Sequence, residues 1–474
     1  MTEPSTAPAR GAPAAPTPAP RAAATDATDA TTAAGTAPPS AIGPAPGDPA
    51  DPFGDTLDAV FGAGGGDTLE AVVDPVAAEQ PQPEAEDVTG LAVWAVVFAG
   101  GIGSRFWPLS TPERPKPLLA LVGERPLIAE TVARLDPLVP PERVLVLTSA
   151  DIADALHAAI PEVPAANMLV EPRPMGTAAS LAWGAQEVAR RAGPATPLVA
   201  VHADLAVGYP DELRRLLARA ARLAADEAPL VVLGAEPTRP EPGFGYVLPG
   251  EALDVEEGAA ETMAASAMAD AGEVPPPLPG ASPRTAARRV RRFVEKPAPL
   301  LADQLITDGA FWHTGILVAT AAGVLDALAE RTPELQPGLA ALAAGKFDRF
   351  AGMIQNVSLE RGLLERVPDL VVLPGAFGWD DVGTWAALRR VRELDDTGNG
   401  VWGSAHLVDA SSSVVHAEGG DTVVLYGLSG VLVVTRPGLT FVTTLERAAA
   451  LTPLLDALPD ELRGGRRAPP AELR

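Results

Sequence analysis

The sequence predicts an α/β fold, with a Rossmann-like, mostly parallel but mixed sheet between helices and a small C-terminal β domain after it. Three observations lead to this prediction. Between residues 88 and 395, short apolar runs alternate with Ala/Leu/Arg-rich stretches, which is typical of strands and helices in a parallel sheet. A glycine-rich loop follows the first apolar run. After residue 396 the helical stretches stop and short strands follow closely.

The chain divides into three predicted regions. Residues 1–87 are mostly Ala, Pro, Thr, Gly and Asp, so they bury too little apolar surface to order themselves, and we expect a disordered tail. Residues 88–395 form the α/β domain, which residues 250–288, acidic and then proline-rich, interrupt as a predicted mobile insertion. Residues 396–474 form a β module of solenoid or β-helix-like type with a terminal helix.

The predicted elements follow from the length and composition of each run, because buried strands are short and apolar whereas helices are longer. The expected strands of the α/β domain are Val93–Ala99, Val144–Thr148, Leu198–His202, Leu230–Gly234, Val290–Glu295, Gly315–Ala319 and Leu370–Leu373. The expected helices are Pro126–Leu135, Ile152–Ala159, Ala178–Arg191, Asp211–Ala225 and Ala321–Glu330. The C-terminal strands are expected at Val401–Ala410, Ser413–Ala417, Thr422–Tyr426, Val431–Thr435 and Thr440–Thr443, before a helix at Ala448–Leu458 that Pro459 ends.

The composition argues against several classes of function. The 474 residues include no cysteine, which excludes disulfides, thiolate metal sites and cysteine nucleophiles, and five histidines argue against a multi-histidine metal site. A formal net charge of −25 disfavours nucleic acid and anionic membranes as partners. No apolar run reaches the roughly 18 residues of a membrane span, and no apolar signal region begins the chain, so we expect a cytoplasmic protein.

The segment after the first predicted strand has the features of an anion-binding loop. Three glycines in residues 100–103 allow a tight turn whose backbone N–H groups face a ligand, and Arg105 adds a positive charge. Because α/β sheets bind ligands at the carboxyl ends of their strands, this loop predicts a polyphosphate site.

Lys116 is a second cation near this loop, and the composition singles it out. Of 36 basic residues only three are lysines, Lys116, Lys296 and Lys346, and the first two stand in Pro-Lys-Pro and Glu-Lys-Pro contexts. A planar guanidinium does not replace a compact ammonium at a tight phosphate site. We therefore expect Lys116 and Lys296 to contact phosphate, the alternative being survival of two lysines by chance.

Carboxylates follow two other predicted strands. Asp204 comes directly after the strand that ends at His202, and Asp380 and Asp381 lie between two tryptophans after the strand that ends at Leu373. Such carboxylates can hold Mg²⁺, which takes few protein ligands and completes its coordination with substrate phosphates. Each aspartate could instead cap the following helix. Of the adjacent pair, we favour Asp381 as the metal ligand.

Further polar residues predict a pocket lining. Gly245 begins a strand where the backbone can approach a ligand, and Glu295 and Lys296 end a strand with an acid for hydroxyl groups and a cation for phosphate. The Trp-His-Thr-Gly turn with His313 and the Ser-Leu-Glu segment with Glu360 would complete the lining. The structural alternatives are a glycine turn, an exposed ion pair and ordinary capping.

Taken in chain order, these segments resemble the sugar-phosphate nucleotidyltransferases, and most closely the bacterial mannose-1-phosphate guanylyltransferases (GDP-mannose pyrophosphorylases). The resemblance runs from about Val93 to Ala410. It rests on AGGIGSRFWPLS with RPKPLL, EPRPMGTAAS, HAD, GFGYV, FVEKP, WHTG, SLERGLLE and FGWDDVGTW. The C-terminal strands resemble the short β-helix-like extension of that family.

The resemblance implies a role for each matching position. The nucleotide would bind at Ala99, Gly100, Gly101, Gly103, Ser104, Glu171 and Thr177. The sugar phosphate would bind at Gly245, Glu295, Lys296, His313 and Thr314. The catalytic residues would be Arg105, Lys116, Asp204 and Asp381, and the two aspartates would hold Mg²⁺, the one cofactor expected.

Some positions depart from the family pattern. Met175 and Gly176 stand in place of an Arg-Asn pair, Pro117 of Gln, His202 of Pro, Leu205 of His, and His313 of Asn. Phosphate and metal positions are kept, whereas base- and sugar-facing positions have changed. Nucleotidyl transfer is therefore better supported than guanine or mannose.

The expected reaction transfers a guanylyl group from GTP to mannose 1-phosphate, by in-line attack on the α-phosphorus, and yields GDP-mannose and pyrophosphate. One alternative is uridylyl or thymidylyl transfer to glucose 1-phosphate. The other is a catalytically silent protein that binds a sugar nucleotide. A homodimer formed through the C-terminal β domain is a further expectation.

Overall fold

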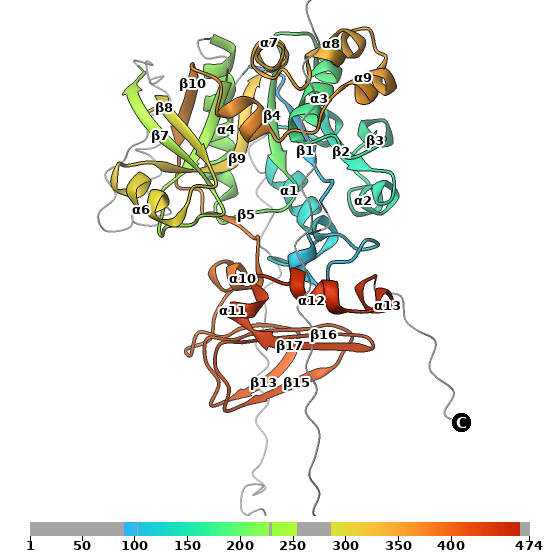
Figure 1. Ribbon diagram of the computed structural model, residues 1–474, viewed down its shortest axis with the longest axis vertical. Coiled ribbons are helices and arrows are strands. Elements are labelled where there is room, and N and C mark those ends of the chain that lie inside the picture. The colour runs from blue at the N-terminus through green and yellow to red at the C-terminus, as the bar shows by residue number, and fades with distance from the viewer. Residues whose placement is uncertain (1–89, 102, 227–229, 254–285, 465–474) are drawn as a thin grey trace, which may run out of the picture. The chain divides into compact units, whose positions relative to one another are not determined.

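The computed structural model in Figure 1 describes residues 90–101, 103–226, 230–253 and 286–464. The predicted tail at 1–87 and residues 254–285 of the predicted insertion lie outside these ranges. Within them, a nine-stranded sheet with helices on both faces forms the larger part, and the C-terminal residues form two smaller sheets. The predicted α/β class is confirmed.

The large sheet is mixed. Its strands are β1 (Trp94–Phe98), β2 (Val144–Ser149), β3 (Met168–Glu171), β4 (Pro197–His202), β6 (Leu230–Ala235), β7 (Gly245–Ala252), β8 (Arg288–Glu295), β9 (Phe311–Thr320) and β10 (Leu370–Pro374). They lie in the order β3-β2-β1-β4-β9-β6-β10-β8-β7. Strands β3, β2, β1 and β4 pair in parallel, as do β6 and β10, whereas β9 runs antiparallel between β4 and β6. The parallel arrangement is therefore limited to these two parts, because β7 and β8 are also antiparallel.

Successive residues of β1 face opposite sides of the sheet, as the pleat requires. Ala95 and Val97 belong to one buried core, and Val96 and Phe98 belong to the other. Because helices cover both faces, no position of the strand can be polar, and an unbroken apolar run predicts it.

The helices divide between these two cores. Helices α1 (Leu127–Leu135), α2 (Ala153–Ala159) and α4 (Pro210–Asp226) pack on the side of Ala95. Helices α3 (Thr177–Ala192), α7 (Ala321–Arg331), α8 (Gln336–Ala343) and α9 (Phe347–Met353) pack on the side of Val96. A further helix, α6 (Pro299–Thr307), packs against β7 in a small separate core. No prediction covered α6, α8 or α9.

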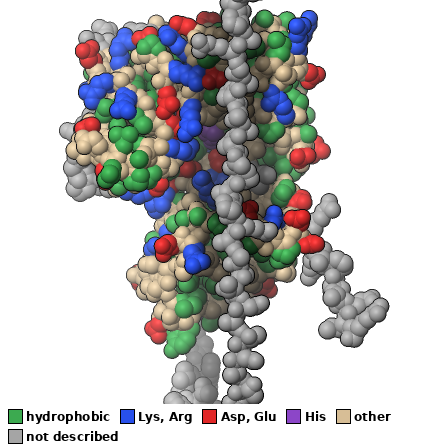
Figure 2. Space-filling model, in the orientation of Figure 1, with side chains coloured by type: hydrophobic (Ala, Val, Ile, Leu, Met, Phe, Trp, Pro, Cys, Tyr) green, Lys and Arg blue, Asp and Glu red, His purple; other side chains and the backbone are tan. Residues whose placement is uncertain are grey.

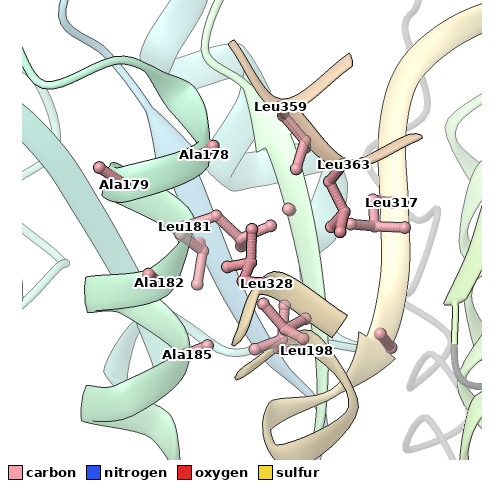
Figure 3. Packing of buried hydrophobic residues seen from close by; sticks show 14 of the residues in the cluster. Ala178, Ala179, Leu181, Ala182, Ala185, Leu198, Leu317, Leu328, Leu359 and Leu363 are labelled. Atoms are coloured by element: carbon pink, nitrogen blue, oxygen red, sulfur yellow. The ribbon is translucent and has the colours of Figure 1, made fainter. Parts of the chain in front are cut away.

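Helix α3 approaches the sheet closely, which explains its alanine content. An added Cβ at Gly184 would lie 2.7 Å from Cγ1 of Val96, so this position has no room for a side chain. Figure 3 shows the alanines of α3 in the same core as Leu198 of β4, Leu317 of β9 and Leu328 of α7.

Two short strands outside the large sheet were not predicted. Strands β5 (Leu205–Val207) and β11 (Trp379–Asp381) pair antiparallel, with Asp381 opposite Leu205. The capping alternative is wrong for the adjacent aspartates, because Thr384 caps the next helix, α10 (Trp385–Val391). It is also wrong for Asp204, which lies in the turn between β4 and β5.

The C-terminal strands alternate between two sheets. They are β12 (Gly400–Trp402), β13 (Ser404–Val408), β14 (Val414–Ala417), β15 (Thr422–Tyr426), β16 (Val431–Arg436) and β17 (Leu439–Thr444). Strands β12, β14 and β16 pair in parallel, β13 pairs in parallel with β15, and β17 is antiparallel to β16. The predicted single strand Val401–Ala410 is wrong, because Gly403, with φ of +85°, turns the chain between two strands. The β-helix-like assignment stays a prediction.

The predicted helix Ala448–Leu458 is wrong in its continuity. The chain forms three short helices, α11 (Leu445–Ala448), α12 (Thr452–Ala457) and α13 (Asp460–Arg463). Pro453 lies in the first turn of α12 and Pro459 precedes α13. Proline has no N–H to donate to the preceding turn, so a continuous helix cannot pass through either residue.

One face of the described part is rich in basic side chains, although the sequence as a whole is acidic (Figure 2). Figure 2 shows many Lys and Arg side chains on the upper part of one face, although the whole sequence carries −25. Many of the acidic residues fall in residues 1–89 and 254–285, which the structure does not describe. Among the described helices, none has both the length and the apolar character needed to cross a membrane.

The turn at Gly403 allows a test of this fold. An added Cβ there would lie 2.1 Å from the carbonyl oxygen of Ala417, whereas Gly420 has a similar φ of +83° and open space around it. We expect Gly403→Ala to lower the free energy of unfolding by about 2–4 kcal/mol and Gly420→Ala by about 1 kcal/mol. Urea unfolding of both variants measures the difference. Equal losses would mean that the corner between β12 and β13 is wrongly placed.

Candidate active site

Lys116 lies beneath the glycine loop and reaches Asp204. It begins a short 3₁₀ helix, Lys116–Leu118, and only 5% of its surface is exposed. Its Nζ lies 2.8 Å from Oδ2 of Asp204. Gly103 has φ of +72°, and an added Cβ there would lie 2.4 Å from Cβ of Lys116. Glycine is therefore required at 103 both by the backbone and by the packing of the lysine.

Neither the backbone nor the packing requires glycine at the other two glycine positions of the loop, 100 and 101. Neither Gly100 nor Gly101 has a positive φ, and an added Cβ at either would meet no described atom within 4 Å. Both are exposed, as are Ser104 and Arg105. Within the described part of the chain Arg105 has no ion-pair partner. The loop is thus an open, cationic backbone surface that a phosphate group could approach closely.

Pairing of β5 with β11 brings the two predicted metal ligands together. Asp381 lies opposite Leu205, the residue after Asp204. Burial raises the pKa of Asp381, and the charge of Asp204 adds to this effect while Lys116 opposes it. Burial would also raise the pKa of Asp204, but Lys116 and His202 outweigh it, so the pKa of that carboxyl is lowered. The positive charge of Lys116 thus stabilises the ionised form of two nearby carboxylates.

The structure explains why Asp381, and not Asp380, lies beside Asp204. Alternate residues of a strand face opposite sides. Asp380 accepts two hydrogen bonds from Arg390, at 2.7 Å from Nε and 2.8 Å from Nη2. Its charge is therefore already paired on the other face of β11.

The two aspartates alone supply too few ligands to complete the coordination of a magnesium ion. No group of three or more His, Asp or Glu side chains in the described residues is arranged to hold a metal ion. Two carboxylates with an unbalanced negative charge suit Mg²⁺, which commonly takes one or two protein carboxylates and further oxygens from substrate phosphates and water. The donor set therefore fits a magnesium ion that arrives with a nucleotide.

A second group of predicted residues meets at the ends of β7, β8 and β9. Gly245 is paired with Glu295 on one side and with His313 on the other. An added Cβ at Gly245 would lie 2.9 Å from Oε2 of Glu295 and 3.2 Å from Cβ of His313. Burial raises the pKa of Glu295, and Glu360, from the π-helical turn Glu360–Leu364, raises it further.

His313 in this group is neutral at neutral pH. Burial lowers its pKa to about 4, although the carboxylate of Glu360 acts in the opposite direction. Its Nδ1 is buried and has no hydrogen-bond partner in the described part. Depending on its tautomer, a neutral imidazole with a free ring nitrogen can donate a hydrogen bond to a ligand or accept one from it.

Lys296 follows this group and has an unusual backbone. Its φ of +49° lies in the left-handed region that non-glycine residues rarely adopt. Its Nζ donates to Oε1 of Glu295 at 2.6 Å, and more than half of the side chain is exposed. The ion pair named as the structural alternative is thus present, and the strained backbone is a feature that often accompanies ligand sites.

Glu360 was expected in the pocket lining, whereas His202 was not among the predicted site residues, although it connects the two groups. An added Cβ at Gly315 would lie 3.2 Å from Cδ2 of His202. Electrostatic interaction with His202 contributes to lowering the pKa of Asp204 and Asp381 in the first group, and of His313 and Glu360 in the second. His202 lies in the HAD motif, so the sequence did contain a signal for it.

The predicted base-binding positions around Thr177 lie against residues 357–359. Met175 is fully buried, and Thr177 Oγ1 accepts a hydrogen bond of 2.7 Å from the backbone N–H of Leu359. Gly176 has φ of +86°, and an added Cβ would lie 2.4 Å from the carbonyl oxygen of Val357. Glu171 accepts a hydrogen bond from Ser180, and burial raises its pKa. The departure at Gly176 therefore has a packing reason.

Two other predicted or altered positions are buried in the fold. Thr314 is fully buried, and its hydroxyl donates to the carbonyl oxygen of Leu233 at 2.9 Å, which ties β9 to β6. Leu205 packs in the core that lines β1 and α4. The proton of the Thr314 hydroxyl is therefore already used within the protein.

The chain is similar to several known proteins over most of its length. The profile of the nucleotidyl transferase family matches residues 94–263 and 280–397. The mannose-1-phosphate guanylyltransferase of Sinorhizobium fredii is 28% identical over 374 residues, which cover 76% of this chain and 67% of that protein. The enzyme of the same name from Salmonella typhimurium is 29% identical over 367 residues, covering 73% and 70%. A crystal structure from Thermus thermophilus, described as mannose-1-phosphate geranyltransferase, is 30% identical with a TM-score of 0.64, and the match covers 77% of this chain and 99% of that one.

The raised pKa of Asp381 predicts that its charge destabilises the free protein. Without metal or nucleotide, we expect Asp381→Asn to raise the free energy of unfolding at pH 7 by on the order of 1 kcal/mol. The gain should shrink as the pH falls, because the folded wild type protonates Asp381 at a pH where the unfolded chain is still ionised. Thermal unfolding between pH 4 and about 8 in a chelating buffer measures this dependence.

The adjacent residue provides the control. Asp380→Asn removes an acceptor from Arg390, so it should lower stability rather than raise it. If Asp381→Asn destabilised the protein as well, Asp381 would not be the uncompensated member of the pair.

Proposed function

Because this chain belongs to the nucleotidyl transferase family, we propose that it transfers a guanylyl group from GTP to mannose 1-phosphate, giving GDP-mannose and pyrophosphate. The names of its relatives from Sinorhizobium and Salmonella support this donor and acceptor. The observation that carries the proposal is the position of Asp204 and Asp381 around Lys116, beside an open glycine loop. A cytoplasmic location and a homodimer remain predictions.

In the proposed reaction, a phosphate oxygen of mannose 1-phosphate attacks the α-phosphorus of GTP. A new P–O bond forms as the bond to the β-phosphate breaks in line, and pyrophosphate leaves with the bonding electron pair. No residue needs to form a covalent intermediate. Catalysis therefore depends on position and on charge neutralisation.

The residues of the first group would hold the triphosphate. The N–H groups of the loop at Gly100 and Gly101, the exposed Arg105 and the buried Lys116 would oppose its negative charge. When bound, Mg²⁺ held by Asp204 and Asp381 would neutralise the phosphate oxygens on which charge develops. The metal ion would also balance the negative charge of the two aspartates that Lys116 alone does not compensate in the free protein.

The residues of the second group would hold the sugar phosphate. Glu295 can accept hydrogen bonds from sugar hydroxyl groups, and the free ring nitrogen of His313 can pair with another. Lys296 would contact the phosphate by breaking its exposed bond with Glu295. A Cβ at Gly245 would crowd Glu295 and His313, so glycine at this position allows the two side chains to lie close together.

A second candidate is nucleotidyl transfer with another base and sugar, such as uridylyl or thymidylyl transfer to glucose 1-phosphate. Met175 and Gly176 favour it, because they stand where the guanylyltransferase pattern has an Arg-Asn pair, and Met175 is fully buried. A catalytically silent sugar-nucleotide-binding protein is the alternative from another class of function.

A substrate panel distinguishes these candidates. We expect pyrophosphate release to have its highest kcat/KM with GTP and mannose 1-phosphate, among GTP, UTP and dTTP combined with mannose 1-phosphate and glucose 1-phosphate. A higher kcat/KM with another combination would reassign the substrates. Binding of nucleotide and sugar phosphate with no release from any combination would identify the silent protein.

Lys116 should be needed for turnover and should not be replaceable by arginine. We expect Lys116→Ala to lower kcat at least about a hundredfold and Lys116→Arg at least about tenfold, because a planar guanidinium cannot occupy the space under Gly103. Lys346→Arg, at the third lysine, should leave kcat unchanged. Steady-state pyrophosphate release with circular dichroism of each variant measures both activity and folding. Near-normal turnover of Lys116→Arg would place the phosphate site elsewhere.

A further inference from the structure

The segment that carries Lys116 rests on the C-terminal β domain. Phe106, Trp107 and Leu119 from this segment share one buried core with Val434 and Phe441 from the C-terminal strands. The rings of Trp107 and Phe441 meet edge to face, with centroids 5.1 Å apart. Residues more than 300 positions later in the chain therefore help to support the segment that follows the glycine loop.

A half-buried ion pair reinforces this contact. Arg114 donates two hydrogen bonds to Glu418, at 2.7 Å from Nη1 and 3.0 Å from Nη2. Burial by itself would raise the pKa of Glu418, yet His416 and Arg114 hold it at about 2. The carboxylate therefore stays ionised at every pH at which the folded protein is expected to work.

A second contact joins the segment after Lys116 to the same part of the C-terminal β domain. Arg392 donates from Nε to the carbonyl oxygen of Leu121 at 2.7 Å, and its Nη2 lies 3.4 Å from Nδ1 of the buried His416. Nε2 of the same imidazole lies 3.3 Å from Oε1 of Glu418. Residues 114 and 121, on either side of Lys116, are thus fixed to one polar cluster.

Only Pro115 separates Arg114 from Lys116. The backbone of Arg114 forms two hydrogen bonds of 3.1 Å with Thr111, which close a tight loop. Pro115 has φ of −68°, which its ring fixes. The position of the Arg114 backbone therefore determines where Lys116 begins, with little freedom between them.

We propose that Glu418 is a positioning residue for the reaction. Through Arg114 it holds Lys116 beneath the glycine loop and against Asp204, so a residue of the C-terminal β domain tunes the phosphate site. The kinetic part of this inference rests on the proposed function. In the described residues, no hydrogen bond or ion pair joins Gly245 and Glu295 of the proposed sugar-phosphate site to this cluster, so that site should be unaffected.

The matched test compares two ion pairs of similar geometry. Glu418→Gln keeps the shape of the side chain but removes its charge. Glu334→Gln does the same at a pair with Arg366, which has hydrogen bonds of 2.8 and 2.8 Å. Side-chain exposures of the Arg and Glu are 43% and 24% in the first pair, and 34% and 22% in the second. Each substitution therefore removes a charged partner from an arginine at a similar exposure, and Glu418→Gln also disturbs the contact with His416.

We expect Glu418→Gln to lower kcat about tenfold and to leave KM for the sugar phosphate within about twofold, since the phosphate site is disturbed and the sugar site is not. Glu334→Gln should change neither value. The double variant Arg114→Gln/Glu418→Gln should lose no more than the more impaired of its two single variants, because both remove one interaction. Equal kcat for the Glu418→Gln and Glu334→Gln variants would overturn the proposal.

Hydrogen–deuterium exchange separates this proposal from the proposed function. We expect faster backbone exchange in residues 103–118 of Glu418→Gln, and wild-type exchange there in Glu334→Gln. This measurement does not depend on the substrate or on turnover. An inactive wild type would contradict the proposed function alone, whereas unchanged exchange in the Glu418→Gln variant would contradict the positioning role.

Discussion

The buried contact between Lys116 and Asp204 is the interaction on which the rest of the site depends. It draws together the glycine loop after β1, the turn after β4 and the β5–β11 ribbon, three segments that are far apart in the sequence. A single ammonium compensates one carboxylate well, but Asp381 stands beside it with a raised pKa. The free protein therefore keeps a poorly compensated negative charge at the place where a cation and a phosphate would bind.

Much of this fold was predictable because the core strands are buried on both faces. Strands such as β1, β4 and β10 are apolar at nearly every position, and short unbroken apolar runs are typical of strands covered by helices on both sides. The short strands β5 and β11 were missed because they owe their existence to pairing with each other, and Asp380 and Asp381 have low intrinsic strand preference. The sheet also has less parallel character than expected, since antiparallel β9 lies at its centre.

The residue types of the site were easier to predict than its contacts. Lysine usage singled out Lys116, and the position of Asp204 after a strand marked a ligand site, but only the fold could join either to Asp381. His202 was treated as a departure from a pattern, although its ring acts on both groups of the site. Sequence alone also could not reveal that Thr314 and Thr177 use their hydroxyl groups to fix the backbone.

The shared core of Phe106, Trp107 and Phe441 has a consequence for the order in which the protein matures. A ribosome releases residues 90–391, with the whole large sheet, before the strands that support the Lys116 segment. In a nascent chain at that stage, Phe106 and Trp107 after the glycine loop lack their partners from the C-terminal strands. The support of the Lys116 segment is therefore complete only after β16 and β17 have been synthesised.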